Sequence, residues 1–126
     1  MEIIYKIQDW LQSRKWRIQK KRRGWSDPEL WNLDDTVSKW IVPRLKAFQA
    51  ETEGCPPDTD FVDWMLEIRE MIFGFEFDGS EWYEKNVFQI KNPEEREKKL
   101  NEYKDLCQRA LDGRILFAKR FEYLWW

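Results

Sequence analysis

The sequence predicts an all-α protein: a compact helical bundle of three to four main helices, one of them kinked at Pro43. Apolar residues recur at three- and four-residue steps over long segments. Helix-start signals are repeated along the chain, and the connections between segments are short. At 126 residues the chain has the size of one domain, with a basic N-terminal helix in residues 1–23 and an aromatic-rich core in residues 24–126.

The first predicted helix spans residues 2–22. No glycine or proline occurs in it before Gly24, which is well placed to end it. Its apolar residues fall at helical spacing, and they are Ile3, Ile4, Ile7, Trp10, Leu11 and Ile18.

The start of the second helix is marked by several signals in residues 24–34. Ser26 and Glu29 have the spacing of a capping box, and Pro28 fits a first turn because its missing amide needs no partner there. In an alternative register Asp27 is the cap and Pro28 is the first helical residue. Either register starts a helix within a residue of position 27.

The second helix is expected to run to about residue 53, where Gly54 ends it. Pro43 deletes one helical hydrogen bond and crowds the carbonyl group four residues earlier. We therefore expect a kink or a break between residues 39 and 43. The apolar pattern resumes in phase after Pro43, which favours the kink.

A third helix follows, capped by Asp58 or Thr59, and its end is expected within residues 74–79. Residues 80–91 form either a short helix or an irregular aromatic loop. Asn92 and Pro93 repeat the cap-and-proline pattern and start a fourth helix that runs to about residue 124. Gly113 weakens the middle of this helix, where a bend is expected.

The chain contains nine tryptophans, and the pattern leaves two interpretations open. In one, they fill the core with a few large side chains. In the other, some are exposed and stack on a partner or on bases. The apolar residues at 124–126 are expected to pack against the rest of the protein.

The net charge is only −2, but acids and bases occupy different segments. Residues 51–84 contain eleven acids and one base, Arg69, whereas residues 1–23 are strongly basic. The basic run is a solvated helix end that pairs with the acidic block, a contact for nucleic acid, or a contact for an acidic protein surface. The acidic block is a solvated face or a phosphate-mimicking surface that occupies the nucleic-acid groove of a basic enzyme. The candidate partner-binding residues are Arg14, Lys15, Trp16, Arg17, Lys20, Lys21, Arg22 and Arg23 in the basic run, and Asp58, Asp60, Asp63, Glu67 and Glu70 in the acidic block.

The sequence offers little for catalysis. It has no histidine, which removes Ser-His-Asp and Cys-His sites and most zinc and di-iron sites. Cys55 and Cys107 are far apart, and no glycine-rich phosphate loop occurs. The acid pairs Asp34/Asp35 and Glu67/Glu70 are interpreted as solvated-face acids rather than metal ligands. We expect no cofactor and no bound metal, no membrane span, no signal peptide and a cytoplasmic location.

The segment Gly24-Trp25-Ser26-Asp27-Pro28-Glu29-Leu30-Trp31-Asn32-Leu33-Asp34 resembles a family of small proteins of tailed bacteriophages that has no established activity. The resemblance continues through residues 41–48, 71–76 and 116–125, and it includes little of residues 1–23 and none of 78–98. It implies a phage origin and a compact helical fold, and it assigns no catalytic residue.

From these observations we expect a non-enzymatic phage accessory protein that acts by binding a host protein. Such a protein would inhibit or modulate a component of anti-phage defence, as an anti-CRISPR protein does. The alternative is a sponge-like binder of nucleotides or single-stranded nucleic acid, using exposed tryptophans and the basic run 14–23. The sequence does not indicate an oligomeric state.

Overall fold

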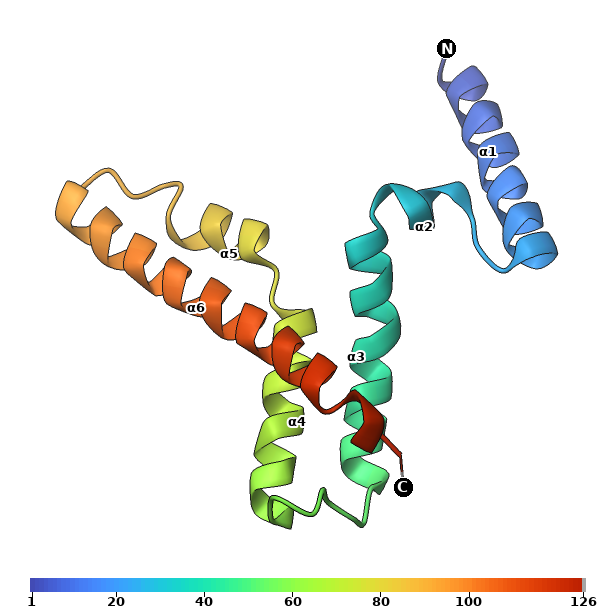
Figure 1. Cartoon of the computed structure of the whole chain (residues 1–126). Helices are drawn as coiled ribbons and strands as arrows, with labels where there is room; N and C mark the ends of the chain where they lie inside the picture. Colours follow the sequence, from blue (N-terminus) through green and yellow to red (C-terminus); the bar gives the residue numbers. More distant parts are fainter. Residues whose placement is uncertain (126) are drawn as a thin grey trace. The chain divides into compact units, whose positions relative to one another are not determined.

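The computed structural model describes residues 1–125, which are almost entirely helical and contain no β-strand (Figure 1). Six α-helices are followed by one short 3₁₀ helix, so the predicted helical class is confirmed and the predicted number of main helices is too low. By its contacts the chain divides into two units, residues 1–38 and 39–126. A single domain over the whole chain stays a prediction.

The first unit contains α1 (Glu2–Arg23), α2 (Asp27–Trp31) and the start of α3 (Leu33–Glu51). The prediction of the first helix is confirmed, and Gly24 ends it with a left-handed φ of 92° while its amide donates to the Lys20 carbonyl group at 2.9 Å. Only glycine adopts this conformation without steric cost, which explains its position.

The second predicted helix, 26–53, is wrong in one respect: it is two helices, separated at Asn32. Asn32 leaves the helical conformation (φ −126°, ψ 62°), and its carbonyl group accepts from the Thr36 amide in the first turn of α3. The Thr36 hydroxyl donates to the Glu29 carbonyl group at 2.9 Å. A side chain therefore satisfies a carbonyl group that a continuous helix would have paired with a backbone amide.

Helix α3 continues through Pro43, so the break considered between residues 39 and 43 does not occur, and the kink stays a prediction. One helical carbonyl group near the proline has a side-chain donor, because Arg44 Nη1 lies 2.8 Å from the Trp40 oxygen. The helix ends at Glu51, three residues before the predicted stop at Gly54.

The second unit continues with α4 (Phe61–Glu76), α5 (Gly79–Asn86), α6 (Pro93–Lys119) and the 3₁₀ helix Phe121–Tyr123. The cap of α4 is Asp60 and not Asp58 or Thr59, because Asp60 has the extended backbone and accepts from the Asp63 amide at 2.8 Å.

The other helix boundaries of this unit agree more closely with the sequence pattern. The end of α4 falls within the predicted range, and residues 80–91 contain both predicted alternatives, a short helix and then a turn. Asn92 caps α6 as predicted, accepting from the amides of Glu94 and Glu95. The helix ends at Lys119, before the expected residue 124.

The core of the second unit lies where α3, α4 and α6 meet. Its buried residues are Leu45, Trp64, Ile68, Met71 and Ile72. Half-buried side chains from α3, α4, α6 and the segment after it pack around them, among them Phe48, Phe75 and Phe117. Phe75 and Phe117 meet edge to face with ring centroids 5.1 Å apart.

Helices α4 and α6 cross each other (Figure 1), and Gly74 and Gly113 lie where their backbones come closest. A Cβ atom on Gly113 would lie 2.1 Å from the Glu70 carbonyl oxygen, and one on Gly74 would lie 2.8 Å from the Ala110 carbonyl oxygen. These neighbours are backbone atoms of the opposite helix, which have no rotamer by which to move away. Gly113 thus allows close helix packing, a role that the sequence pattern did not predict.

Charged groups reinforce this crossing. Arg109 donates twice to the Glu70 carboxylate, at 2.8 Å for each bond, and its guanidinium group lies 3.9 Å from the centroid of the Phe73 ring. Arg114 donates to the Gly74 carbonyl group at 2.8 Å. The hydrogen bond from Arg109 holds the pKa of Glu70 below its ordinary value.

Candidate functional site

The strongest candidate for a functional surface is α1 together with its connection to α2. No residue of α1 is buried, although the helix has 22 residues and a run of apolar side chains. Bases occupy its last turn and an acid its first, which is the arrangement that the helix dipole favours.

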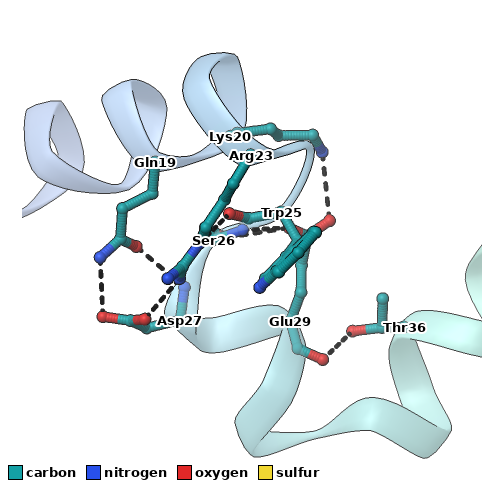
Figure 2. A network of polar contacts seen from close by, with 8 residues as sticks. All are labelled: Gln19, Lys20, Arg23, Trp25, Ser26, Asp27, Glu29 and Thr36. Carbon is teal, nitrogen blue, oxygen red and sulfur yellow. Dashed lines mark hydrogen bonds and ion pairs between the residues drawn. The ribbon is translucent and has the colours of Figure 1, made fainter.

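A polar network joins the end of α1 to the start of α2 (Figure 2). Arg23 Nη2 lies 2.6 Å from Asp27 Oδ1, and Lys20 Nζ lies 3.3 Å from Glu29 Oε1. Gln19 binds Asp27 twice, donating to its carboxylate at 2.9 Å and accepting from its amide at 3.0 Å. Figure 2 shows these α1 side chains directed at the first turn of α2.

The predicted helix start at Ser26 is part of the same network. Ser26 is the N-cap residue, and its amide and hydroxyl both donate to the Glu29 carboxylate. The Ser26 amide is the main reason that the pKa of Glu29 is lowered, while hydrogen bonds from Gln19 and then Arg23 lower the pKa of Asp27. The lowered pKa values mean that these hydrogen bonds favour the ionised form of both carboxylates.

The basic run divides into two groups. Lys20 and Arg23 are used within the first unit, in the network just described. The other bases of the run form no ion pair among residues 1–125, and they are Arg14, Lys15, Arg17, Lys21 and Arg22. These five positive charges remain available to an acidic partner.

The apolar face of α1 is exposed beside these bases. Ile7 is 52% exposed, Trp10 54% and Leu11 52%. Ile3, Ile4 and Ile18 belong to the same set of exposed residues. The guanidinium group of Arg14 lies 5.7 Å from the Trp10 ring centroid, so the apolar and basic parts of the helix touch. A contiguous exposed apolar face of this kind is typical of a binding surface.

The tryptophans favour the second interpretation of the sequence. Of those in residues 1–125, only Trp64 is buried, and the exposed ones are Trp10, Trp25, Trp31, Trp40 and Trp125. Trp16, the predicted partner-binding aromatic residue, is half-buried and meets the Trp31 ring edge to face at 6.0 Å. Trp10 is more accessible than Trp16 and is the better candidate for a partner contact. The apolar pattern of residues 3–11, to which Trp10 belongs, was the sequence signal that could have identified it.

The expected packing of residues 124–126 is only partly correct. Leu124 packs against the core, but Trp125 is 74% exposed. Residue 126 lies outside the described residues.

The acidic candidates have partners inside the second unit. Arg120 lies 2.8 Å from the Asp58 carboxylate and 3.1 Å from that of Glu67. The hydrogen bond from Arg120 lowers the pKa of Asp58, and the same bond raises the pKa of Arg120. Glu70 pairs with Arg109 and Asp60 caps α4, as described above. Among the five predicted acids, only the Asp63 carboxylate has no partner within residues 1–125, and binding by these acids stays a prediction.

No group of three acids or cysteines within residues 1–125 is placed to hold a metal ion. The two described cysteines are both free thiols. None of the helices in residues 1–125 combines the length and the apolar character that a membrane-spanning helix needs.

Comparison with known proteins found no matching family model, no similar curated protein and no similar solved structure.

Proposed function

We propose that the protein acts by binding another protein, through the apolar and basic face of α1. The observation that carries this proposal is the exposure of Ile7, Trp10 and Leu11 on one helix, next to five bases that have no ion-pair partner in the part of the chain that the structure describes. An amphipathic helix of this kind binds an apolar groove through residues at three- and four-residue spacing. The bases select a partner whose groove has an acidic rim.

The biological setting belongs to the same proposal. The resemblance of residues 24–34 to small phage proteins supports a phage-encoded accessory protein in the cytoplasm of a bacterial host. Its target would be a host protein, with a component of anti-phage defence as the leading candidate. A non-enzymatic mode of action and a compact bundle over the whole chain are parts of this proposal.

The proposal is tested by affinity capture from host lysate with three baits. The wild-type chain is expected to retain a stoichiometric protein partner. Ile7→Asp combined with Leu11→Asp is expected to lose it, because two charges would enter the apolar contact. Val62→Asp is the matched control, since Val62 is 68% exposed on α4 and a binding face on α1 does not include it. Equal retention by all three baits would contradict the proposal.

A second candidate function is the binding of single-stranded nucleic acid or nucleotides. The exposed indole rings favour it, because Arg14 lies over Trp10 and Arg23 lies 5.4 Å from the Trp25 ring centroid. In each pair the indole ring could stack on a nucleobase while the arginine beside it binds a phosphate group. Titration with a single-stranded oligonucleotide would then quench tryptophan fluorescence in a salt-dependent manner. Absence of quenching at low salt would exclude this function.

A further inference from the structure

The second unit contains a cavity that the proposed function does not use. It has a volume of about 490 Å³ and is lined by residues 53–57, Trp64, Glu122, Tyr123 and Trp125. This volume lies in the range of small-ligand pockets. We propose that this cavity binds an organic cation: an alkylammonium or guanidinium group on an apolar stem.

The walls of the cavity are held in place from several sides. Trp64 is 1% exposed and meets the Phe48 ring edge to face at 6.4 Å, so the indole is fixed in the core. Arg120, paired with Asp58 and Glu67, anchors the start of the 3₁₀ helix that contains Tyr123. Pro56 and Pro57 also line the cavity and restrict the backbone there. These lining residues are therefore held in place without a ligand.

The lining has the chemistry of a cation site. Tyr123 and Trp125 both line the cavity, and tryptophan attracts a cation more strongly than the other aromatic residues do. The Arg120 guanidinium group already lies 5.8 Å from the Tyr123 ring centroid, so the proposed contact with a further cation is assigned to Trp125. Trp125 is 74% exposed, and no cation or ring within residues 1–125 is paired with it. A ligand that covered this indole would remove a large apolar surface from water.

Two carboxylates add negative charge to the same cavity. Glu53 and Glu122 line it, and neither forms an ion pair within residues 1–125. The nearest base in the sequence, Arg120, is already held by Asp58 and Glu67. An anion would be repelled here, and a neutral apolar ligand would leave both carboxylates without a counter-charge. A cation with an apolar stem matches both the negative charge of the two carboxylates and the apolar surface of the aromatic rings.

Cys55 provides a reporter, because it is an exposed free cysteine that lines the cavity, with its thiol donating to the Thr59 carbonyl group at 3.6 Å. The full chain is treated separately with a thiosulfonate that carries a trimethylammonium group and with one that carries a sulfonate group. Mass spectrometry then gives the modification rates at Cys55 and at Cys107, which lies in α6 and serves as the internal reference. For each cysteine, the preference is the rate with the cationic reagent divided by the rate with the anionic reagent. We expect this preference to be roughly tenfold higher at Cys55 than at Cys107.

Variants identify the groups responsible. Glu53→Gln with Glu122→Gln is expected to bring the preference at Cys55 down to that at Cys107. Glu84→Gln, an exposed acid in α5 outside the lining, is the matched control and should leave the preference unchanged. An unchanged thermal midpoint in each variant shows that the chain remains folded. Equal preference at the two cysteines in the wild-type chain would overturn the proposal.

Competition distinguishes two sources of the cation. Protection of Cys55 by choline indicates a free small molecule, whereas protection only by an arginine- or lysine-containing peptide indicates a side chain of a protein partner. Either result supports the proposal if 3,3-dimethylbutanol, the neutral analogue of choline, gives no protection and Trp125→Ala abolishes the effect. Equal protection by choline and by its neutral analogue, or protection by neither cation, would overturn it.

Discussion

Residues 1–38 and residues 39–126 both contain amphipathic helices, but they use their apolar residues differently. In the second unit Trp64, Ile68 and Met71 are almost completely buried, whereas no residue of α1 or α2 is buried. The second unit therefore has a core that supplies its own stability. An isolated helix of 22 residues is only marginally stable in water, so α1 depends on its end signals and its contacts with α2.

The two units also differ in how their charged side chains are paired. In the second unit, Arg109 and Arg120 are paired with acids of α4 and of the chain before it. In the first unit, Lys20 and Arg23 hold α2, and the five other bases of the run 14–23 have no ion-pair partner within residues 1–125. The surplus of positive charge coincides with the exposed apolar face, and this coincidence is the basis of the proposed function.

The largest effect is expected at the crossing of α4 and α6. Gly113→Ala would place a methyl group 2.1 Å from the Glu70 carbonyl oxygen, and we expect a loss of about 3 kcal/mol or more in the free energy of unfolding. Urea unfolding followed by circular dichroism measures this loss. Gly54→Ala is the control, because no atom lies within 4 Å of its added Cβ, and a comparable loss there would contradict the explanation.

A pair of core and surface substitutions compares the two units directly. Ile68→Ala removes a fully buried side chain and is expected to cost about 2–4 kcal/mol. Ile7→Ala removes a side chain that is 52% exposed, so we expect a change within about 0.5 kcal/mol together with weaker partner binding. Chemical denaturation gives both values. Similar losses for the two variants would show that Ile7 belongs to a core.

Acid is expected to weaken the second unit through its paired carboxylates. Hydrogen bonds from Arg109 and Arg120 lower the pKa values of Glu70 and Asp58 in the folded chain. Because a lowered pKa means that folding favours the ionised form, this stability is complete at neutral pH and is lost as the pH falls below about 4. Glu70→Gln should reduce the slope of stability against pH between about pH 5 and pH 2. An unchanged slope would contradict the role given to this pair.

The smallest effect is expected at the joint between α1 and α2. Glu29→Gln weakens the bonds to Ser26 and Lys20, and we expect faster amide exchange in α2 without a change in the unfolding midpoint of the second unit. Hydrogen exchange measured by mass spectrometry separates the two responses. A lower midpoint for the second unit would show that this joint contributes to its core.

Local signals predicted much of the helical structure correctly. The first helix, the helix start near position 27 and the Asn92 cap depend on residues close in sequence, and the structure contains all of them. The break at Asn32 was missed because a hydroxyl group satisfies the backbone there, and neither Asn32 nor Thr36 is a residue type that ends helices as strongly as Pro43. Gly113 was missed because its role depends on Gly74, which lies on another helix.

The candidate surface was predicted in part. The basic run was found from composition alone, but the sequence could not show that Lys20 and Arg23 are used locally. The acidic block suggested a partner surface, which stays a prediction. The sequence could not show that Asp58, Glu67 and Glu70 pair with arginines or that Asp60 caps α4. The cavity at Glu53 and Glu122 joins residues far apart in the sequence, and no periodic pattern indicates it.

The central claim is that α1 exposes a binding face while the second unit keeps a closed core. Hydrogen exchange of the full chain, measured without a partner at a concentration where it is monomeric, tests this claim most directly. We expect the amides of residues 2–23 to exchange far faster than those of α4 and α6, since no residue of α1 is buried. Protection of α1 equal to that of α4 would contradict the claim.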